Sequence, residues 1–271
     1  MKIFKDKHIL QKEISKTKGI SFVPTMGGLH KGHISLIKQS KKSKFKTLVS
    51  IFVNPKQFNK KRDFKSYPRS TKKDIKKLKN LKVDYLYIPT IKDIYGFKPR
   101  EKVYLDKFSK KLCGRFIIGH FEGVLNVVNR FLEIIKPRYI FLGKKDYQQL
   151  YLIKKHILKN KFKSKIIECK TIRENNGVAF SSRNSNLYED QMKIASNIYY
   201  YLYNLKKKIK KNYNLFNPNR IKKDLRDLGA RKIDYLENYD VKNFDKIKKP
   251  NKKFNLFFAY YIKNIRLIDN I

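Results

Sequence analysis

The 271-residue sequence has no tryptophan, only two cysteines and no long apolar run. The thiols of Cys113 and Cys169 are too few for a disulfide framework and lack the spacing of metal ligands, so both are expected to be reduced. No apolar stretch approaches the roughly 18 residues of a transmembrane helix, and charge throughout residues 1–10 argues against a signal peptide. We therefore expect a cytoplasmic protein with no membrane partner.

Acidic residues are also scarce: 22 Asp and Glu stand against 66 Lys and Arg, which gives a net charge of +44. Such a charge raises the possibility of a nucleic-acid partner. However, the lysines are scattered from end to end, and no aromatic-interleaved RNA motif or helix-turn-helix accompanies them. Lys, Asn, Ile, Tyr and Phe are all plentiful, a bias that A·T-rich codons alone produce. The sequence therefore predicts a solvated basic surface and no specific nucleic-acid partner.

The most informative segment is 19–40. A short apolar run at 20–23 predicts a buried parallel strand, which we expect Pro24 to end. Residues 25–28 form a turn with little side-chain bulk, and the apolar spacing from Leu29 onward is helical. In an open α/β sheet, ligands lie beyond the carboxyl ends of the strands, where free N–H groups and the helix dipole favour phosphate. This strand, turn and helix therefore predict a phosphate site.

Two histidines stand in the first helical turn of this segment. His30 and His33 are three residues apart, which places both imidazoles on one helix face. Gly32 between them lowers helix stability by roughly 1 kcal/mol relative to alanine, which indicates that a ligand such as a base and ribose approaches the backbone there. The alternative is a helix with two surface histidines. We favour a functional pair because the chain has only five histidines.

Polar side chains follow two other predicted strands. Strand 47–53 precedes Asn54 and Gln57, whose neutral amides suit the hydroxyls or carboxylate of a small polar substrate; equally, Asn54 could simply form a turn with the proline that follows. A second group of polar residues follows strand 139–142 and contains Lys144, Lys145, Asp146, Gln148 and Gln149. Because this group lies beside a predicted phosphate site, we expect one of its two lysines to point inward.

Two further candidates lie outside these strand ends. Asp74 stands near the start of a predicted helix at 70–81, where it either stabilises the helix dipole or binds Mg²⁺ on a polyphosphate. A loop after the predicted strand 165–172 offers two hydroxyls and a guanidinium in succession, which suits phosphate oxygens. Its residues are Ser181, Ser182 and Arg183.

The remaining pattern predicts an α/β domain followed by a small α+β unit. The N-terminal stretch 1–18 reads as a strand and a short helix with an apolar stripe of Ile9, Leu10 and Ile14. We place the domain boundary in the turn around Asn175, which gives domains 1–174 and 175–271. The other predicted elements are strands at 83–88, 103–105, 232–239 and 254–261 and helices at 120–135, 191–211 and 218–228.

Motifs from nearly the whole chain resemble one family. They are P-T-M-G-G-L-H-K-G-H at 24–33, S-I-F-V-N-P-K-Q-F at 50–58, Y-P-R at 67–69, G-H-F-E-G-V at 119–124, G-K-K-D-Y-Q-Q-L at 143–150, S-S-R-N at 181–184 and R-L-I-D-N at 266–270. In this order they are similar to the pantothenate synthetases, the pantoate-β-alanine ligases of the HxGH nucleotidyltransferase superfamily. H-x-G-H alone indicates only the superfamily. The alternative is therefore another member that adenylates a different small carboxylic acid.

The resemblance implies an ATP-dependent ligase with a two-step reaction. Pantoate attacks the α-phosphate of ATP to give pantoyl adenylate and pyrophosphate, and β-alanine then attacks the acyl carbonyl to release pantothenate and AMP. The fold class implied is α/β, with a Rossmann-like, doubly wound parallel sheet that binds ATP and pantoate and a smaller C-terminal α+β lid domain. Members of the family use Mg²⁺ with ATP and usually form homodimers.

The resemblance also implies a role for each candidate residue. His30 and His33 contact the phosphates, and Lys145 bridges them as charge moves onto the leaving pyrophosphate. Gln57 and Gln149 match the two amides that hold pantoate. Asp74 matches a position near Mg²⁺. The other implied ATP contacts are Met26, Gly32, Gly143, Asp146, Ile172, Ser181, Ser182 and Arg183, with Gly143 and Asp146 at the ribose hydroxyls.

Two departures from the family pattern lie near the predicted site. Lys144 stands where an acidic residue usually precedes the lysine, and Ile117 and Ile118 stand where the family usually has Arg-Pro. These changes alter the charge beside Lys145 and remove polar or rigid groups from the wall of the predicted pantoate pocket. We therefore expect reduced turnover.

Overall fold

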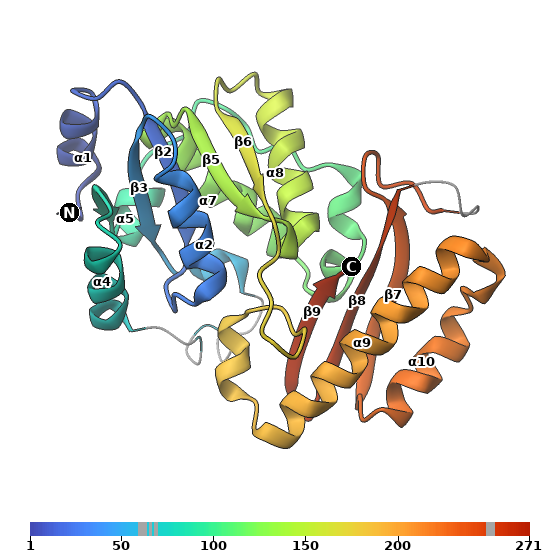
Figure 1. The fold of residues 1–271 in the computed structure, drawn as a ribbon. Coiled ribbons are helices and arrows are strands. Elements are labelled where there is room, and N and C mark those ends of the chain that lie inside the picture. The colour runs from blue at the N-terminus through green and yellow to red at the C-terminus, as the bar shows by residue number, and fades with distance from the viewer. Residues whose placement is uncertain (59–63, 65–66, 68–69, 248–252) are drawn as a thin grey trace. The chain divides into compact units, whose positions relative to one another are not determined.

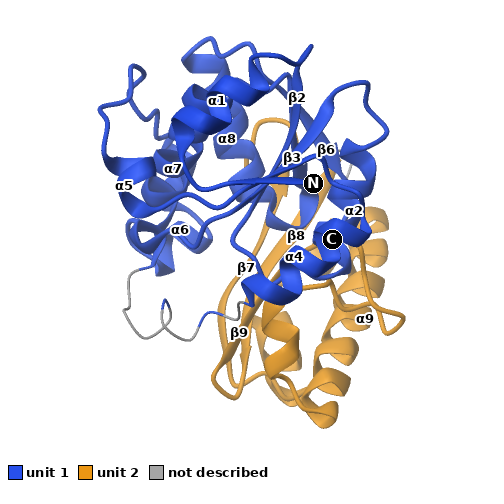
Figure 2. Cartoon of the chain, turned by 90° about the vertical axis from the view of Figure 1, so that its left-hand side faces the viewer, with its two compact units in different colours: residues 1–171 blue, residues 172–271 orange. Residues whose placement is uncertain are grey.

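The computed structural model describes residues 1–58, 64, 67, 70–247 and 253–271 (Figure 1). The chain forms two compact units, residues 1–171 and 172–271 (Figure 2). The division falls at 171/172, whereas the sequence predicts a boundary at 174/175. Most of the Y-P-R motif at 67–69 lies outside the described residues.

The first unit is built on a six-stranded parallel sheet with the order β1-β4-β3-β2-β5-β6. From the central strand β2, the chain adds β3 and β4 on one side and β5 and β6 on the other. The order therefore reverses between β2 and β5, which makes their carboxyl ends the topological switch point where doubly wound sheets bind ligands. The strands are β1 (Lys2–Phe4), β2 (Ile20–Thr25), β3 (Lys46–Ile51), β4 (Tyr85–Tyr87), β5 (Tyr139–Gly143) and β6 (Lys165–Cys169).

Helices cover both faces of this sheet (Figure 1). On one face, α2 and α4 pack through Ile37 and Leu78 into a core with Val23, Val49 and other alternate strand residues. On the other face, Phe131 of α7 makes an edge contact with Phe22, with ring centroids 5.3 Å apart. The helices are α1 (Lys7–Ile14), α2 (Lys31–Ser40), α4 (Thr71–Asn80), α5 (Ile91–Tyr95), α6 (Cys113–Phe116), α7 (His120–Ile135) and α8 (Tyr147–Lys159). The predicted α/β doubly wound fold is confirmed.

Three local predictions in this unit are wrong. Pro24 does not end its strand, because β2 continues to Thr25; β2 pairs with β5 only at Ser21 and Phe22, so the missing proline N–H falls where that ladder has already ended. Residues 103–105 form no strand. Ile9 of α1 is 63% exposed, and only Leu10 and Ile14 of the predicted stripe are buried.

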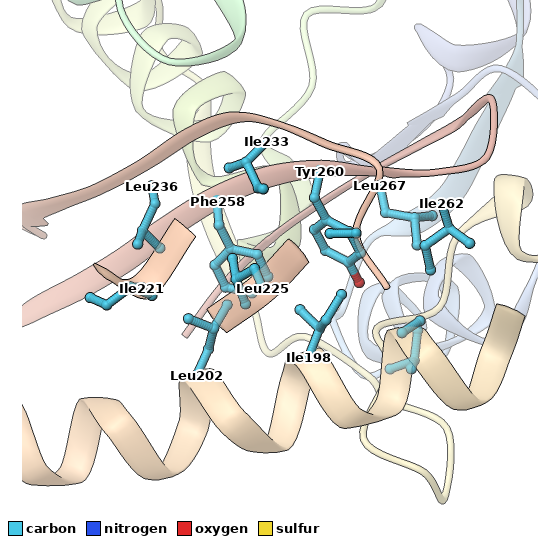
Figure 3. Close-up of a cluster of buried hydrophobic side chains, with 13 residues drawn as sticks. Ile198, Leu202, Ile221, Leu225, Ile233, Leu236, Phe258, Tyr260, Ile262 and Leu267 are labelled. Carbon is cyan, nitrogen blue, oxygen red and sulfur yellow. The ribbon is translucent and has the colours of Figure 1, made fainter. Parts of the chain in front are cut away.

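The second unit pairs a three-stranded antiparallel sheet, β7-β8-β9, with two helices. Helix α9 (Glu189–Lys211) and helix α10 (Pro218–Asp227) bury residues at helical spacing, such as Ile198 and Leu202, against Phe258 and other sheet residues (Figure 3). The strands are β7 (Lys232–Asp240), β8 (Phe254–Ile262) and β9 (Ile265–Asn270). The predicted small α+β unit is confirmed, and β9 is a strand that the sequence analysis missed. Among the described residues, no helix has the length and apolar character needed to cross a membrane.

His156 of α8 is a buried polar residue that stabilises the first unit. Its Nδ1 accepts a hydrogen bond from the backbone N–H of Tyr104 at 3.1 Å, and its Nε2 lies 3.0 Å from Asn129 Oδ1. This contact orders the stretch for which a strand is predicted at 103–105. Burial lowers the pKa of His156 to about 4.

We predict that the free energy of unfolding falls as the pH is lowered from about 6.5 towards about 4, because the unfolded chain then binds a proton that folded His156 does not accept. This group contributes up to about 3 kcal/mol of that loss, and the loss levels off below the folded pKa. Urea unfolding of a His156→Gln variant is expected to show a smaller difference between about pH 7 and about pH 5. His8→Gln, on the exposed side of α1, is the matched control; an unchanged pH dependence in His156→Gln would contradict the assignment.

Candidate active site

The site forms where β2 and β5 end, at the switch point of the parallel sheet. The turn after β2 carries Gly27 and Gly28 at φ values of 79° and 62°, in the left-handed region that glycine tolerates best. Gly27 is also confined by space, because a Cβ there would lie 3.0 Å from Asp74 Oδ2 and 3.2 Å from Ile51 Cγ2. The predicted glycine turn is therefore required by both its backbone conformation and its packing.

His30 and His33 lie together at the start of α2. Their ring centroids are 4.0 Å apart. His30 is the N-cap, where its Nδ1 accepts from Gly32 N at 3.2 Å, and His33 Nδ1 accepts from His30 N at 3.4 Å. Since both Nδ1 atoms accept hydrogen bonds, each neutral ring carries its proton on Nε2 and presents an N–H donor.

Burial and neighbouring cations keep this pair uncharged. Burial, with a smaller effect from Lys145, lowers the pKa of His30 to about 4. Burial, followed by the influence of His30, lowers the pKa of His33 to about 3. At neutral pH the two rings are therefore hydrogen-bond donors rather than cations or proton-donating acids.

The two lysines after β5 have different surroundings. Lys145 Nζ is 3.2 Å from Asp146 Oδ1, its side chain is 18% exposed, and its charge acts on both histidines. Lys144 Nζ instead lies 3.3 Å from Glu168 Oε2 on β6. Of the two lysines, Lys145 is therefore the one whose charge acts on the histidine pair. Both belong to the short 3₁₀ turn η3 (Lys144–Asp146).

Gln57 stands at the end of the 3₁₀ turn η1 (Pro55–Gln57) and is buried, with its side-chain amide against Met26 Sδ. Asn54 Nδ2 donates to Gly123 O at 2.9 Å, and Asn54 Oδ1 accepts from the Tyr95 hydroxyl at 2.7 Å. Because the side chain of Asn54 is fully engaged by protein groups, Asn54 forms the turn that presents Gln57 rather than a contact with the substrate.

Helix α7 also fixes the position of Gln57. His120 Nδ1 lies 2.9 Å from the backbone oxygen of Gln57. A Cβ on Gly123 would lie 2.3 Å from the Lys56 backbone oxygen, so the helix approaches η1 as closely as glycine permits. Sequence reasoning missed this support by Tyr95, His120 and Gly123, and only the motif at 119–124 pointed to it.

The two glutamines after β5, like the two lysines, have different surroundings. Gln148 is buried, and its amide nitrogen donates to Phe108 O at 2.9 Å and Lys111 O at 2.8 Å. Gln149 is half-buried and has no side-chain hydrogen-bond partner among the described residues. Of the two, Gln149 is the one whose amide remains available to a ligand.

Four predicted ATP contacts belong to the second unit. Ser181 is the N-cap of the 3₁₀ turn η4 (Ser182–Asn186), and its Oγ accepts from Arg183 N at 3.2 Å. Arg183 Nη1 donates to Arg266 O at 3.1 Å, and Ile172 is 37% exposed. The structure places these residues in one hydrogen-bonded region of that unit, because Phe180 N donates to Ile172 O at 3.1 Å. Their roles toward ATP remain predictions.

Asp74 is the predicted magnesium residue, and its carboxylate is already engaged. Oδ2 accepts from Gly28 N at 2.8 Å and Oδ1 accepts from Leu29 N at 2.9 Å, and the residue is 2% exposed. The described residues contain no group of three or more His, Cys, Asp or Glu side chains that could hold a metal ion. This donor set does not fit a resident metal centre; an ion carried by a polyphosphate takes most of its ligands from phosphate and water. A contact between Asp74 and that ion remains a prediction.

We predict that NMR at neutral pH finds His30 and His33 uncharged, each with a proton on Nε2 and none on Nδ1. Lys145→Met is expected to raise the pKa of His30 from about 4, because a nearby positive charge is lost. Lys76→Met, on the exposed side of α4, is the matched control and leaves that pKa unchanged. A folded protein in which His30 titrates near its ordinary value would contradict this picture.

Comparisons with known proteins identify the family of this chain. The family model described as pantoate-β-alanine ligase matches residues 2–271. A pantothenate synthetase of Flavobacterium psychrophilum is 39% identical over 98% of this chain and 95% of its own length. One of Francisella philomiragia is also 39% identical, over 97% of this chain and 93% of its own length.

Solved structures are similar over the whole chain. A pantoate-β-alanine ligase from Francisella tularensis, complexed with β,γ-ATP and β-alanine, is 36% identical with a TM-score of 0.83 and covers 100% of this chain and 97% of its own. A pantothenate synthetase from Thermus thermophilus is 28% identical with a TM-score of 0.92 and covers 100% of this chain and 99% of its own. The resemblance predicted from the motifs is confirmed: the chain belongs to the pantoate-β-alanine ligase family, and it is a ligase.

Proposed function

We propose that this ligase condenses pantoate with β-alanine at the expense of ATP, through a pantoyl-adenylate intermediate, with release of AMP and pyrophosphate. The observation that carries the proposal is the convergence of a neutral histidine pair and one inward lysine at the switch point of the sheet. Family membership and the relative complexed with β,γ-ATP and β-alanine support the substrates.

In the first step, a carboxylate oxygen of pantoate attacks the α-phosphorus of ATP, and the bond to the β-bridging oxygen breaks. The electron pair leaves with pyrophosphate, so negative charge grows on the phosphoryl oxygens. Such a reaction needs positioning and charge stabilisation rather than a covalent enzyme nucleophile. The Nε2–H groups of His30 and His33 donate to those oxygens, and the ammonium of Lys145 follows the charge onto the leaving group.

In the second step, the neutral amine of β-alanine attacks the acyl carbonyl of the adenylate. The bond to the AMP oxygen breaks, the amine loses a proton, and pantothenate and AMP are released. The same donors stabilise the phosphate of departing AMP. Ser181, Ser182 and Arg183 are proposed to bind the β- and γ-phosphates, and Met26, Gly32, Gly143, Asp146 and Ile172 the rest of the nucleotide.

Two amides select the acid. Gln57 is held by Asn54 and α7, and Gln149 is the available glutamine at the start of α8. Neutral amides suit the hydroxyls and the carboxylate of pantoate, whereas a phosphorylated acceptor calls for Arg or Lys. The alternative, adenylation of a different small carboxylic acid, uses the same histidines and lysine but a different fit at these two amides.

The reaction is proposed to use Mg²⁺, which when bound to ATP neutralises part of the phosphate charge. We also propose a cytoplasmic homodimer, by analogy with the family. Lys144, the unusual residue beside Lys145, is turned toward Glu168, with the atoms 3.3 Å apart, so its charge is partly offset there. Ile118, at the other departure, is 83% exposed.

Activity with defined substrates tests the proposal. With ATP, Mg²⁺, pantoate and β-alanine, we expect AMP and pantothenate in equal amounts, and exchange of pyrophosphate into ATP that requires pantoate but not β-alanine. Gln57→Ala and Gln149→Ala are expected to raise the pantoate KM about tenfold or more, because substrate polar groups lose their partners. Gln39→Ala, on the exposed side of α2, is the control. AMP formation that ignores pantoate, or a better acid substrate, would reject the assignment.

The two neighbouring lysines give a separate prediction. Lys145→Met is expected to lower kcat about a hundredfold or more, because a cation aimed at the developing charge is removed. Lys144→Met, which removes the same charge one residue away, is expected to change kcat by less than about threefold. Steady-state kinetics of the two variants, with thermal unfolding as a check on folding, measure this difference. Equal losses in both variants would mean that the general positive charge, rather than Lys145, matters.

A further inference from the structure

Two side chains of helix α4 hold the glycine turn, one through backbone N–H groups and the other through a backbone carbonyl. Asp74 accepts the N–H groups of Gly28 and Leu29 at 2.8 and 2.9 Å, and Lys77, one helical turn later, donates its ammonium to Leu29 O at 2.5 Å. Both hydrogen-bonding groups of the Leu29 backbone are therefore satisfied by side chains of α4.

This arrangement determines which backbone N–H groups of the turn can bind a phosphate. Successive backbone N–H groups in a tight turn can point toward one concave spot, which is a common anion site. The turn through Gly27 and Gly28 brings the N–H groups of Gly28 and Leu29 together in this way. Here the anion in that spot is a carboxylate of the protein itself, 2% exposed. The N–H groups of Gly28 and Leu29 are thus committed to Asp74 rather than to a ligand.

Lys77 also affects the histidine pair. Its positive charge, like that of Lys145, lowers the pKa of both His30 and His33. The histidine pair is thus influenced by one cation from the end of β5 and one from α4. His30, the N-cap of α2, follows directly after Leu29, so the contact that holds Leu29 also helps to fix the position of the His30 imidazole.

We propose that α4 is the positioning element of the catalytic turn: Asp74 anchors the turn through its N–H groups, and Lys77 completes the anchor at Leu29 O and supplies a second cation at the histidine pair. The proposal rests on the proposed function for its kinetic consequences, but the anchor itself is independent of any substrate. It replaces a metal-binding role for Asp74 with a positioning role.

Hydrogen exchange in the ligand-free protein tests the anchor first. We expect the amides of Gly28 and Leu29 to be protected in the wild-type chain, and Asp74→Asn to speed their exchange about tenfold or more, because the amide side chain offers one acceptor atom in place of two. Fast exchange of both amides in the wild-type chain would overturn the anchor, whether or not the enzyme makes pantothenate.

The dependence of activity on magnesium then separates positioning from metal binding. For a positioning role, Asp74→Asn lowers kcat about tenfold or more while the Mg²⁺ concentration for half-maximal rate stays the same, and added Mg²⁺ restores nothing. If Asp74 is instead a metal ligand, that concentration rises and excess Mg²⁺ restores the rate. The second outcome overturns the proposal.

Lys77→Met keeps the test decisive if Asp74→Asn does not fold. It is expected to raise the ATP KM about threefold to tenfold with an unchanged melting temperature, since Lys77 is exposed at the helix surface apart from its contact with Leu29. Lys76→Met, its neighbour on α4, is the matched control. Equal kinetics of the wild type, Lys76→Met and Lys77→Met would remove Lys77 from the proposal. If the wild-type chain makes no pantothenate at all, the proposed function fails while the exchange result still stands.

Discussion

The contact on which the active site depends is a buried carboxylate that accepts two consecutive backbone N–H groups. Asp74 makes the left-handed conformation of Gly27 and Gly28 favourable, because the N–H groups that this conformation brings together find an acceptor inside the protein. Gly27 has no Cβ, and the carboxylate occupies the space where one would lie. From this turn the chain enters α2 in a fixed direction, with His30 as its N-cap.

The sheet could largely be predicted from the sequence because buried parallel strands are short apolar runs, and those runs are plain in this chain. The errors occur where a neighbour in space decides. Pro24 can stay inside β2 because the adjacent ladder to β5 has ended, which no local pattern reveals. Residues 103–105 are apolar enough for a strand, yet the Tyr104 N–H pairs with a histidine ring on α8 instead of another strand.

The position of the site could be predicted from the strand pattern, but the division of roles within it came only from the family resemblance. Parallel strands carry their following residues to one edge, so the sequence order alone placed the turn and the β5 residues together. Between Lys144 and Lys145, or between Gln148 and Gln149, composition offers no choice. The choice comes from Glu168 on β6 and from carbonyls near α6, which draw one member of each pair away from the site.

Burial, with smaller effects from nearby charges, explains why the two histidines at this site are uncharged. Protonation of His30 or His33 would add charge to a buried place that already feels two lysines, and both burial and those lysines lower the histidine pKa values. A neutral Nε2–H still donates to a phosphate oxygen, and it gains strength as negative charge grows on that oxygen. In the proposed mechanism the fixed rings act together with the ammonium of Lys145 on the negative charge that grows on the phosphate in the transition state. The proposed mechanism therefore places uncharged donors at the reacting phosphate of a chain whose net charge is +44.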